Sequence, residues 1–157
     1  MKENRNEIEI QATPEKVWAV LTDLEKYADW NPLIYRAEGK VALGEKVNIS
    51  AKTASNDMDF RCSVVKVEPN REFSWKFHVI LPFLFRGEHI FRVEPIDEGR
   101  VRFIDREIFN GLLVPLQAKD LETNAKAGMI AMGEALKRRV EHLTDHFTMA
   151  VQWDIAA

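Results

Sequence analysis

The chain has 157 residues, of which 46% are hydrophobic and 30% charged, a composition typical of one soluble globular domain with a sizeable core. A formal net charge of -3 and the absence of any run of lysines and arginines argue against nucleic-acid binding. The single cysteine, Cys62, excludes an intramolecular disulfide and a multi-cysteine metal site. No apolar run is long enough to span a membrane, and the polar first segment lacks a signal-peptide pattern, so we expect a cytoplasmic protein.

The chain opens with a strand pattern followed by two helix signals. Alternation of apolar and polar residues over 6–12 predicts a first strand. Thr13-Pro14-Glu15-Lys16 has the N-cap, the N1 proline and the first-turn acid of a helix, which we expect to end near Asp23. A second short helix is predicted over 25–28. Trp30-Asn31-Pro32 ends it, because the residue before a proline avoids helical geometry.

Six strand-like segments follow, separated by short sequences typical of turns. They cover residues 33–40, 46–53, 59–68, 72–79, 85–94 and 100–109. A long amphipathic helix is then predicted from Pro115 to about Leu143, with Met129 and Met132 among the apolar residues of one side. An antiparallel sheet of this size must curl, and one long helix can close its concave side. The predicted fold class is therefore α+β, a seven-stranded antiparallel sheet wrapped around a long C-terminal helix.

Residues 144–157 form a predicted extension to a single domain of residues 1–143. Every second residue of this tail is large and apolar, which is a strand pattern. These residues are Phe147, Met149, Val151, Trp153 and Ile155. We predict that the tail packs on the same protein or adds to a sheet edge, and a homodimer through residues 147–155 is one such arrangement.

Titratable side chains fall on the phenylalanine-rich face of the predicted hairpin 85–109. The two-residue period of a strand places His89 on that face in the first strand, and Asp105 and Glu107 on it in the second. A turn centred on Asp97 sets His89 opposite Asp105, and a turn centred one residue later sets it opposite Glu107. In either register the opposed Cβ atoms lie about 4.5–5.5 Å apart. Ionisable groups among phenylalanines are costly to bury unless they pair or face a wet cavity, so this face predicts a pocket.

Three roles stay open for His89, Asp105 and Glu107. They are a satisfied polar cluster that fixes strand register, recognition of a ligand hydroxyl or carbonyl, and general acid–base catalysis with His89 and one carboxylate. The sequence has no recognisable nucleophile motif, phosphate-binding loop or metal-ligand set, so we predict no cofactor and no metal.

Most of the predicted ligand-binding residues are aromatic, and the alternation of side chains along each strand places them on the inner face of the sheet. They favour a small hydrophobic or aromatic ligand with one or two polar handles. In full, they are Trp30, Tyr35, Phe60, Phe73, Trp75, Phe77, His89, Phe91, Phe103, Asp105, Glu107, Phe109, Met129 and Met132.

Two loops at one end of the predicted sheet are unusually apolar. Residues 79–85 read Val-Ile-Leu-Pro-Phe-Leu-Phe, and residues 112–116 read Leu-Leu-Val-Pro-Leu. Hairpin loops normally lie in water and carry polar residues. The two loops therefore predict a ligand entrance, a lid, or a contact with a membrane or a partner. Burial of both loops on the long helix is the alternative.

Several short motifs resemble those of a known superfamily. Ala12-Thr13-Pro14-Glu15-Lys16-Val17-Trp18, Trp30-Asn31-Pro32 and Val67-Glu68-Pro69 are similar to the N-terminal half of its bacterial members. His89-x-Phe91-x-Val93-Glu94-Pro95, Glu107-x-Phe109-x-Gly111 and the terminal helix are similar to the second half. The family is the START-like, pollen-allergen-like (SRPBCC) superfamily, in its polyketide cyclase/dehydrase and lipid-transport branch. The resemblance covers residues 3–143 and implies a helix-grip fold with a ligand cavity between sheet and helix.

Three functions follow from the residues and the resemblance together. The leading expectation is non-catalytic binding or transport of a lipid-like or polyketide-like molecule. The alternative is a cyclase or dehydratase that uses His89 with Glu107 or Asp105, and a third is a helper protein that touches a membrane through the 80–85 loop. The resemblance implies pocket arginines and tyrosines in the cyclases. Here the arginines of the last two strands have outward parity and Tyr35 and Asn31 are the nearest polar candidates, which favours a binder over an enzyme.

Overall fold

The computed structural model describes residues 1–52 and 57–156, with side chains described as far as residue 143. Seven strands form one antiparallel sheet in the order β1-β7-β6-β5-β4-β3-β2. The strands are β1 (Lys2–Ile10), β2 (Ile34–Glu38), β3 (Lys46–Lys52), β4 (Asp57–Glu68), β5 (Glu72–Val79), β6 (Phe85–Asp97) and β7 (Arg100–Asn110). The helices are α1 (Pro14–Thr22), the 3-10 turn η1 (Leu24–Lys26), α2 (Tyr27–Trp30), α3 (Val114–Asp120), the π turn η2 (Leu121–Ala125) and α4 (Lys126–Ala156).

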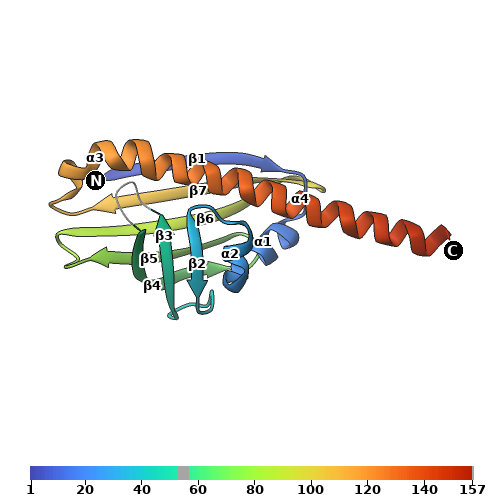
Figure 1. The fold of residues 1–157 in the computed structure, drawn as a ribbon, viewed down its shortest axis with the longest axis horizontal. Coiled ribbons are helices and arrows are strands. Elements are labelled where there is room, and N and C mark those ends of the chain that lie inside the picture. Colours follow the sequence, from blue (N-terminus) through green and yellow to red (C-terminus); the bar gives the residue numbers. More distant parts are fainter. Residues whose placement is uncertain (53–56, 157) are drawn as a thin grey trace.

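The sheet curls around α4 (Figure 1). β1 and β7 run along this helix, whereas β2 and β3 cross them steeply at the other end of the sheet (Figure 1). The inward residues of the strands and one side of α4 make the core, in which Trp75, Phe91, Phe103 and Met132 are fully buried. The seven-stranded sheet, the two short helices after the first strand and the long C-terminal helix confirm the predicted α+β helix-grip architecture.

The helix predicted from Pro115 is divided by the π turn η2. Asn4 of β1, which is buried, donates from its Nδ2 to the backbone oxygen of Leu121 at 2.7 Å. A π turn changes the regular hydrogen-bond spacing of a helix and leaves carbonyl groups in need of other partners. The Asn4 side chain supplies one, and it thereby ties the start of the C-terminal helices to the edge strand of the sheet.

The prediction of a strand over residues 147–155 is wrong. α4 continues to Ala156, and its C-terminal part extends past the sheet in Figure 1. Once a helix has formed, each added residue contributes one further hydrogen bond, and no glycine or proline follows Gly133 to stop the extension. The side chains after residue 143 lie outside the described part of the structure, so the homodimer through residues 147–155 stays a prediction.

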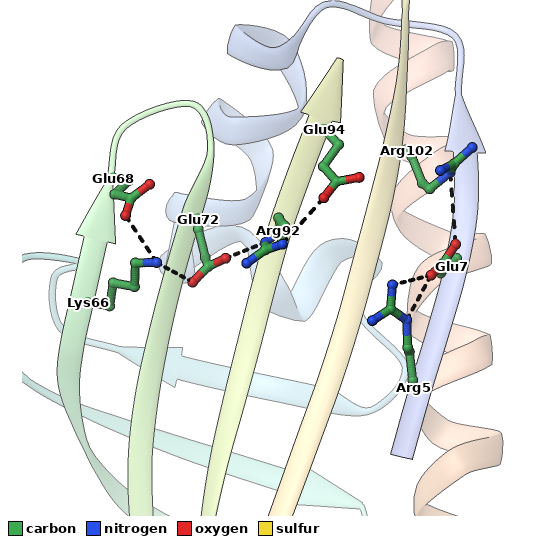
Figure 2. Close-up of polar contacts among 8 residues, drawn as sticks. All are labelled: Arg5, Glu7, Lys66, Glu68, Glu72, Arg92, Glu94 and Arg102. Atoms are coloured by element: carbon green, nitrogen blue, oxygen red, sulfur yellow. Dashed lines mark hydrogen bonds and ion pairs between the residues drawn. The ribbon is translucent and has the colours of Figure 1, made fainter. Parts of the chain in front are cut away.

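Charged side chains of opposite sign pair across the outer face of the sheet (Figure 2). Glu72 is 8% exposed and lies between Lys66, 2.7 Å away, and the guanidinium of Arg92. Burial alone would raise the pKa of Glu72, but the hydrogen bonds from Lys66 and Arg92 hold this pKa below its usual value. Lys66–Glu68 and Arg92–Glu94 extend this network, and Arg5–Glu7 and Arg102–Glu7 form a separate group beside it (Figure 2). A slip of one residue would turn each of these side chains to the opposite face, so the network favours the observed register.

Candidate functional site

The predicted polar cluster forms on the inner face of β6 and β7. His89 lies opposite Glu107 and Phe91 lies opposite Asp105, which is the second of the two registers that the sequence allowed. The imidazole nevertheless contacts both carboxylates. Its Nε2 is 2.6 Å from Asp105 Oδ1, a hydrogen bond, and its Nδ1 is 3.5 Å from Glu107 Oε1. The sequence left open whether His89 contacts Asp105 or Glu107, and in the structure its ring contacts both.

The cluster lies in an aromatic environment. The His89 ring stacks on Phe91 with centroids 4.0 Å apart, and the Trp75 ring meets it edge-on at 6.0 Å. Burial alone would lower the pKa of His89, but the charges of Asp105 and Glu107 and the hydrogen bond to Asp105 raise this pKa above its usual value. Burial raises the pKa of Glu107 to about 7. The imidazole is thus held between two carboxyl groups, and the pKa of one of them, Glu107, lies near neutral pH.

Two polar atoms beside His89 are buried without a hydrogen-bond partner among the described residues. They are Asp105 Oδ2, an acceptor, and Trp75 Nε1, a donor. Buried polar atoms in native proteins nearly always have a partner, so each such atom needs an explanation. A polar group of a bound molecule or a water would satisfy either one, and Asp105 and Trp75 therefore remain candidates for the recognition of a polar handle.

Sequence reasoning missed two polar residues on this wall. Asn4 and Asn6 of β1 lie opposite Glu107 and Asp105 of β7, and Asn6 reaches α4, where its Nδ2 would be 2.9 Å from a Cβ added to Gly133. The signal was present, because both asparagines share the strand parity of Ile8 and Ile10.

Most of the predicted lining rings form the core itself. Phe73 and Phe91 stack at 4.7 Å, and Trp75 meets Phe91 at 5.0 Å. The predicted residues that are fully buried are Phe73, Trp75, Phe91, Phe103, Met129 and Met132. Phe109 is buried in a second apolar cluster with Phe85, Val114 and Leu121.

Trp30 and Tyr35 are half-buried, and Trp30 packs against the core cluster that contains these rings. Trp30 packs against Tyr27 at 5.0 Å, and Tyr35 lies where the register of β2 shifts. The structure therefore brings His89, Asp105, Glu107 and the core rings together, whereas the remaining predicted rings, Phe60 and Phe77, border a cleft.

The cleft lies where the sheet splits between β4 and β5. β4 pairs with β5 from Ser63 to Glu68, but residues 57–62 pair with β3 alone and residues 77–79 pair with β6 alone. The register shifts between Val64 and Lys66, and such a bulge bends and twists a strand. The resulting cleft has a volume of about 1100 Å³.

Rings and cations line the cleft. Phe60 and Phe77 meet across the split at 4.9 Å, and Phe77 lies directly over Gly87, where an added Cβ would be 2.4 Å from the Phe77 ring. The lining also includes lysines and arginines of the outer face of the sheet, namely Lys46, Arg61, Lys76 and Arg86. The two rings were predicted from the sequence as ligand-binding residues, and the cations were not. No local pattern identifies these cations, because their proximity depends on how the strands diverge.

The two apolar loops meet at the end of the sheet beside this cleft. The backbone N–H groups of Leu112 and Leu113 donate to the carbonyls of Phe83 and Leu84 at 3.1 and 3.0 Å. Phe83 is 58% exposed and Leu112 is 73% exposed, so these side chains are not buried on the long helix. Ile80 and Pro82 of the first loop also line the cleft. The apolar surface and the cleft are therefore continuous.

None of the helices within residues 1–52 and 57–156 has the length and apolar character needed to cross a membrane. Among the side chains of residues 1–52 and 57–143, no group of three or more His, Cys, Asp or Glu is arranged to hold a metal ion.

Comparison with solved structures identifies the fold. The Zhui aromatase/cyclase from Streptomyces is similar with a TM-score of 0.74 and 18% identity, over 89% of this chain and 93% of that one. A START superfamily protein from Mycobacterium smegmatis has a TM-score of 0.71 and 18% identity, over 90% and 98% of the two chains. Norcoclaurine synthase from Thalictrum flavum has a TM-score of 0.70 and 14% identity, over 91% and 96%.

Comparison of sequences identifies the family. No curated protein matches the chain. The sequence model of the family described as polyketide cyclase/dehydrase and lipid transport matches residues 1–143. With the helix-grip fold and this match, the chain belongs to the polyketide cyclase/dehydrase and lipid-transport family.

Proposed function

We propose that this protein binds or carries a small, largely apolar molecule, lipid-like or polyketide-like, without converting it. The observation that carries the proposal is the cleft of about 1100 Å³ bordered by Phe60 and Phe77. Small-molecule sites are concave, have volumes of about 300–1,000 Å³, and combine apolar and aromatic walls with a few polar groups. The cleft between β4 and β5 is slightly larger than this range, and its lining places apolar side chains such as Phe60, Phe77 and Ile80 beside polar and charged ones.

The exposed apolar loops supply the route to the cleft in this proposal. Ile80 and Pro82 belong both to the first loop and to the cleft lining, and Phe83 and Leu112 extend the apolar surface outward. Contiguous exposed apolar surface of this kind marks a place where a ligand, a membrane or a partner makes contact. A contact of the 80–85 loop with a membrane would place the cleft beside a source of apolar ligand.

Two variants separate ligand binding from membrane contact. In a fluorescence titration with N-phenylnaphthylamine, Phe60→Ala should weaken probe binding by about tenfold or more, because the ring supplies apolar contact worth at least about 1.4 kcal/mol. Phe60→Leu keeps most of that contact and should keep most of the binding. In co-sedimentation with lipid vesicles, Phe83→Asp should reduce the pelleted fraction, whereas Phe60→Ala should leave it unchanged.

Matched controls make the outcome decisive. Thermal melts of each variant establish that the fold is intact, and Phe83→Asp should leave probe binding unchanged. If wild-type protein does not bind the probe, or if Phe60→Ala binds it as well as wild type does, the cleft is not the ligand site. Equal sedimentation of wild type and Phe83→Asp would remove the membrane contact.

Acid–base catalysis is the second candidate function, and one observation favours it. Glu107 has a pKa of about 7 beside the hydrogen-bonded pair His89–Asp105, and a general acid or base works best when its pKa is near the working pH. On incubation with a poly-β-keto thioester, the proposed binder should return the substrate intact by mass spectrometry. Formation of a cyclised or dehydrated product that His89→Gln abolishes, with probe binding retained, would replace binding by catalysis.

A further inference from the structure

Arg61 and Arg86 differ from the other arginines of the sheet. Each of the others has a carboxylate within ion-pairing distance, as Arg92 has Glu72 and Arg102 has Glu7 (Figure 2). The remaining pairs are Arg5–Glu7, Arg36–Glu38, Arg100–Asp97 and Arg106–Glu3. Within residues 1–52 and 57–143, no carboxylate pairs with Arg61 or Arg86, and both side chains are exposed. They are the two strand arginines without an ion-pair partner in that part of the chain.

Both arginines line the cleft, one on each side of the split. Arg61 lies on β4, on the part of the strand that pairs with β3 alone, opposite Asn48. Arg86 lies on β6, opposite His78 of β5 and Asn110 of β7. The two arginines and the cross-strand neighbours just named therefore form one row of side chains across the split. This row contains cationic and neutral polar groups and no carboxylate.

The two carboxylates that do line the cleft already have partners. Asp59 Oδ1 accepts a hydrogen bond from Ser50 at 2.6 Å. Glu88 accepts one from Ser74 at 3.0 Å and lies 3.5 Å from Lys76 Nζ. Neither needs Arg61 or Arg86, so an incoming anion would not have to break an existing ion pair to reach the guanidinium groups.

The cleft thus combines two chemistries in one volume. The rings of Phe60 and Phe77 offer apolar contact, and Arg61 and Arg86 offer planar donor groups that suit the oxygens of a carboxylate or a phosphate. A purely apolar ligand would leave the guanidinium groups unused, and a small inorganic anion would leave the rings unused. An amphipathic anion uses both.

We propose that the cleft takes an amphipathic organic anion, whose carboxylate or phosphate head is held by Arg61 and Arg86 and whose apolar body lies on Phe60 and Phe77. This inference rests on the proposed ligand-binding function and specifies the class of ligand. It makes Arg61 and Arg86 the residues that select a charged ligand over a neutral ligand of the same shape.

A matched pair of probes tests the inference. Dansyl-labelled undecanoic acid and its methyl ester share the apolar body and differ in the charge of the head. The acid should bind wild-type protein about tenfold more tightly than the ester, the change expected for one charge-assisted contact worth about 1.4 kcal/mol. Arg61→Gln combined with Arg86→Gln should abolish this preference and leave the ester's affinity unchanged. Added salt should weaken binding of the acid and not of the ester.

The controls separate this inference from the proposed function. Arg102→Gln removes an exposed arginine that is paired with Glu7 and does not line the cleft, and it should leave both affinities unchanged. Equal affinities of acid and ester in wild type, both lost in Phe60→Ala, would overturn the anion site and keep the ligand cleft. Binding of neither probe would overturn both. Dodecanoate and dodecyl phosphate, as competitors of the labelled acid, show which head the two arginines prefer, and displacement by either supports the site.

Discussion

Asp105→Ala should lower the free energy of unfolding by about 3–5 kcal/mol, the usual cost of removing one partner of a buried ion pair. Asp105 is fully buried, and its Oδ1 accepts the hydrogen bond of His89 at 2.6 Å. Without this carboxylate, the buried imidazole keeps only Glu107, at 3.5 Å, as a charged partner. Urea denaturation at neutral pH, followed by tryptophan fluorescence, measures the loss.

Two further variants test the cause of this loss. Asp59→Ala removes an exposed aspartate whose hydrogen bond is to Ser50, and it should change the free energy of unfolding by no more than about 0.5 kcal/mol. The double variant His89→Leu with Asp105→Leu removes both charges together, and it should be less destabilised than Asp105→Ala, because no uncompensated charge stays buried. If Asp105→Ala lowers the free energy of unfolding by no more than Asp59→Ala does, the His89–Asp105 pair does not stabilise the fold measurably.

The free energy of unfolding should fall as the pH rises from about 5 to about 8. Burial raises the pKa of Glu107 from 4.5 to about 7, so between these values the folded protein binds a proton that the unfolded chain has released. Stability contributed by a raised pKa is present at low pH and is lost as the pH rises through the folded value. A change from 4.5 to about 7 corresponds to about 3 kcal/mol. The raised pKa of His89 acts in the same direction, from about 6.5 upward.

Glu107→Gln isolates the contribution of the carboxyl group. The variant should have a flatter stability profile between pH 5 and 7, because glutamine keeps the shape of the neutral acid and does not ionise. Glu3, Glu72 and Glu141 have lowered pKa values, so their contributions are lost only as the pH falls below about 4.5, outside this window. Glu45→Gln, on an exposed glutamate, is the matched control. A profile for Glu107→Gln as steep as that of wild type would contradict the assignment.

The polar cluster shows how far local sequence patterns reach. Strand parity placed His89, Asp105 and Glu107 on the inner face, because successive side chains alternate by covalent geometry alone. The same alternation, extended to the start of β1, also predicts that Asn4 and Asn6 lie on the inner face. The pairing of His89 could not be read in the same way, because a change of one residue in the turn exchanges Asp105 for Glu107 and leaves the parity intact.

The C-terminal tail shows where a local pattern misleads. The alternation over residues 147–155 is real, but it competes with a helix that has already formed through α4. Continuing a helix costs less than ending it and starting a strand, and the tail has no glycine or proline at which the helix would stop. If a proline preceded residues 147–155, it would end the helix, and the alternation would then predict a strand more reliably.

The sequence by itself determined the order of the elements, the curled sheet around a long helix, and the inward faces that carry His89, Asp105 and Glu107. These properties follow from spacing along a single segment of chain. The tertiary structure alone decided that the imidazole bridges both carboxylates and that the sheet splits between β4 and β5. It also brought Arg61 and Arg86 to one cleft with Phe60 and Phe77. The position of the imidazole depends on the register of β6 against β7, and the split and the cleft depend on a bulge near Val65 and on the relative directions of distant strands, which no local periodicity encodes.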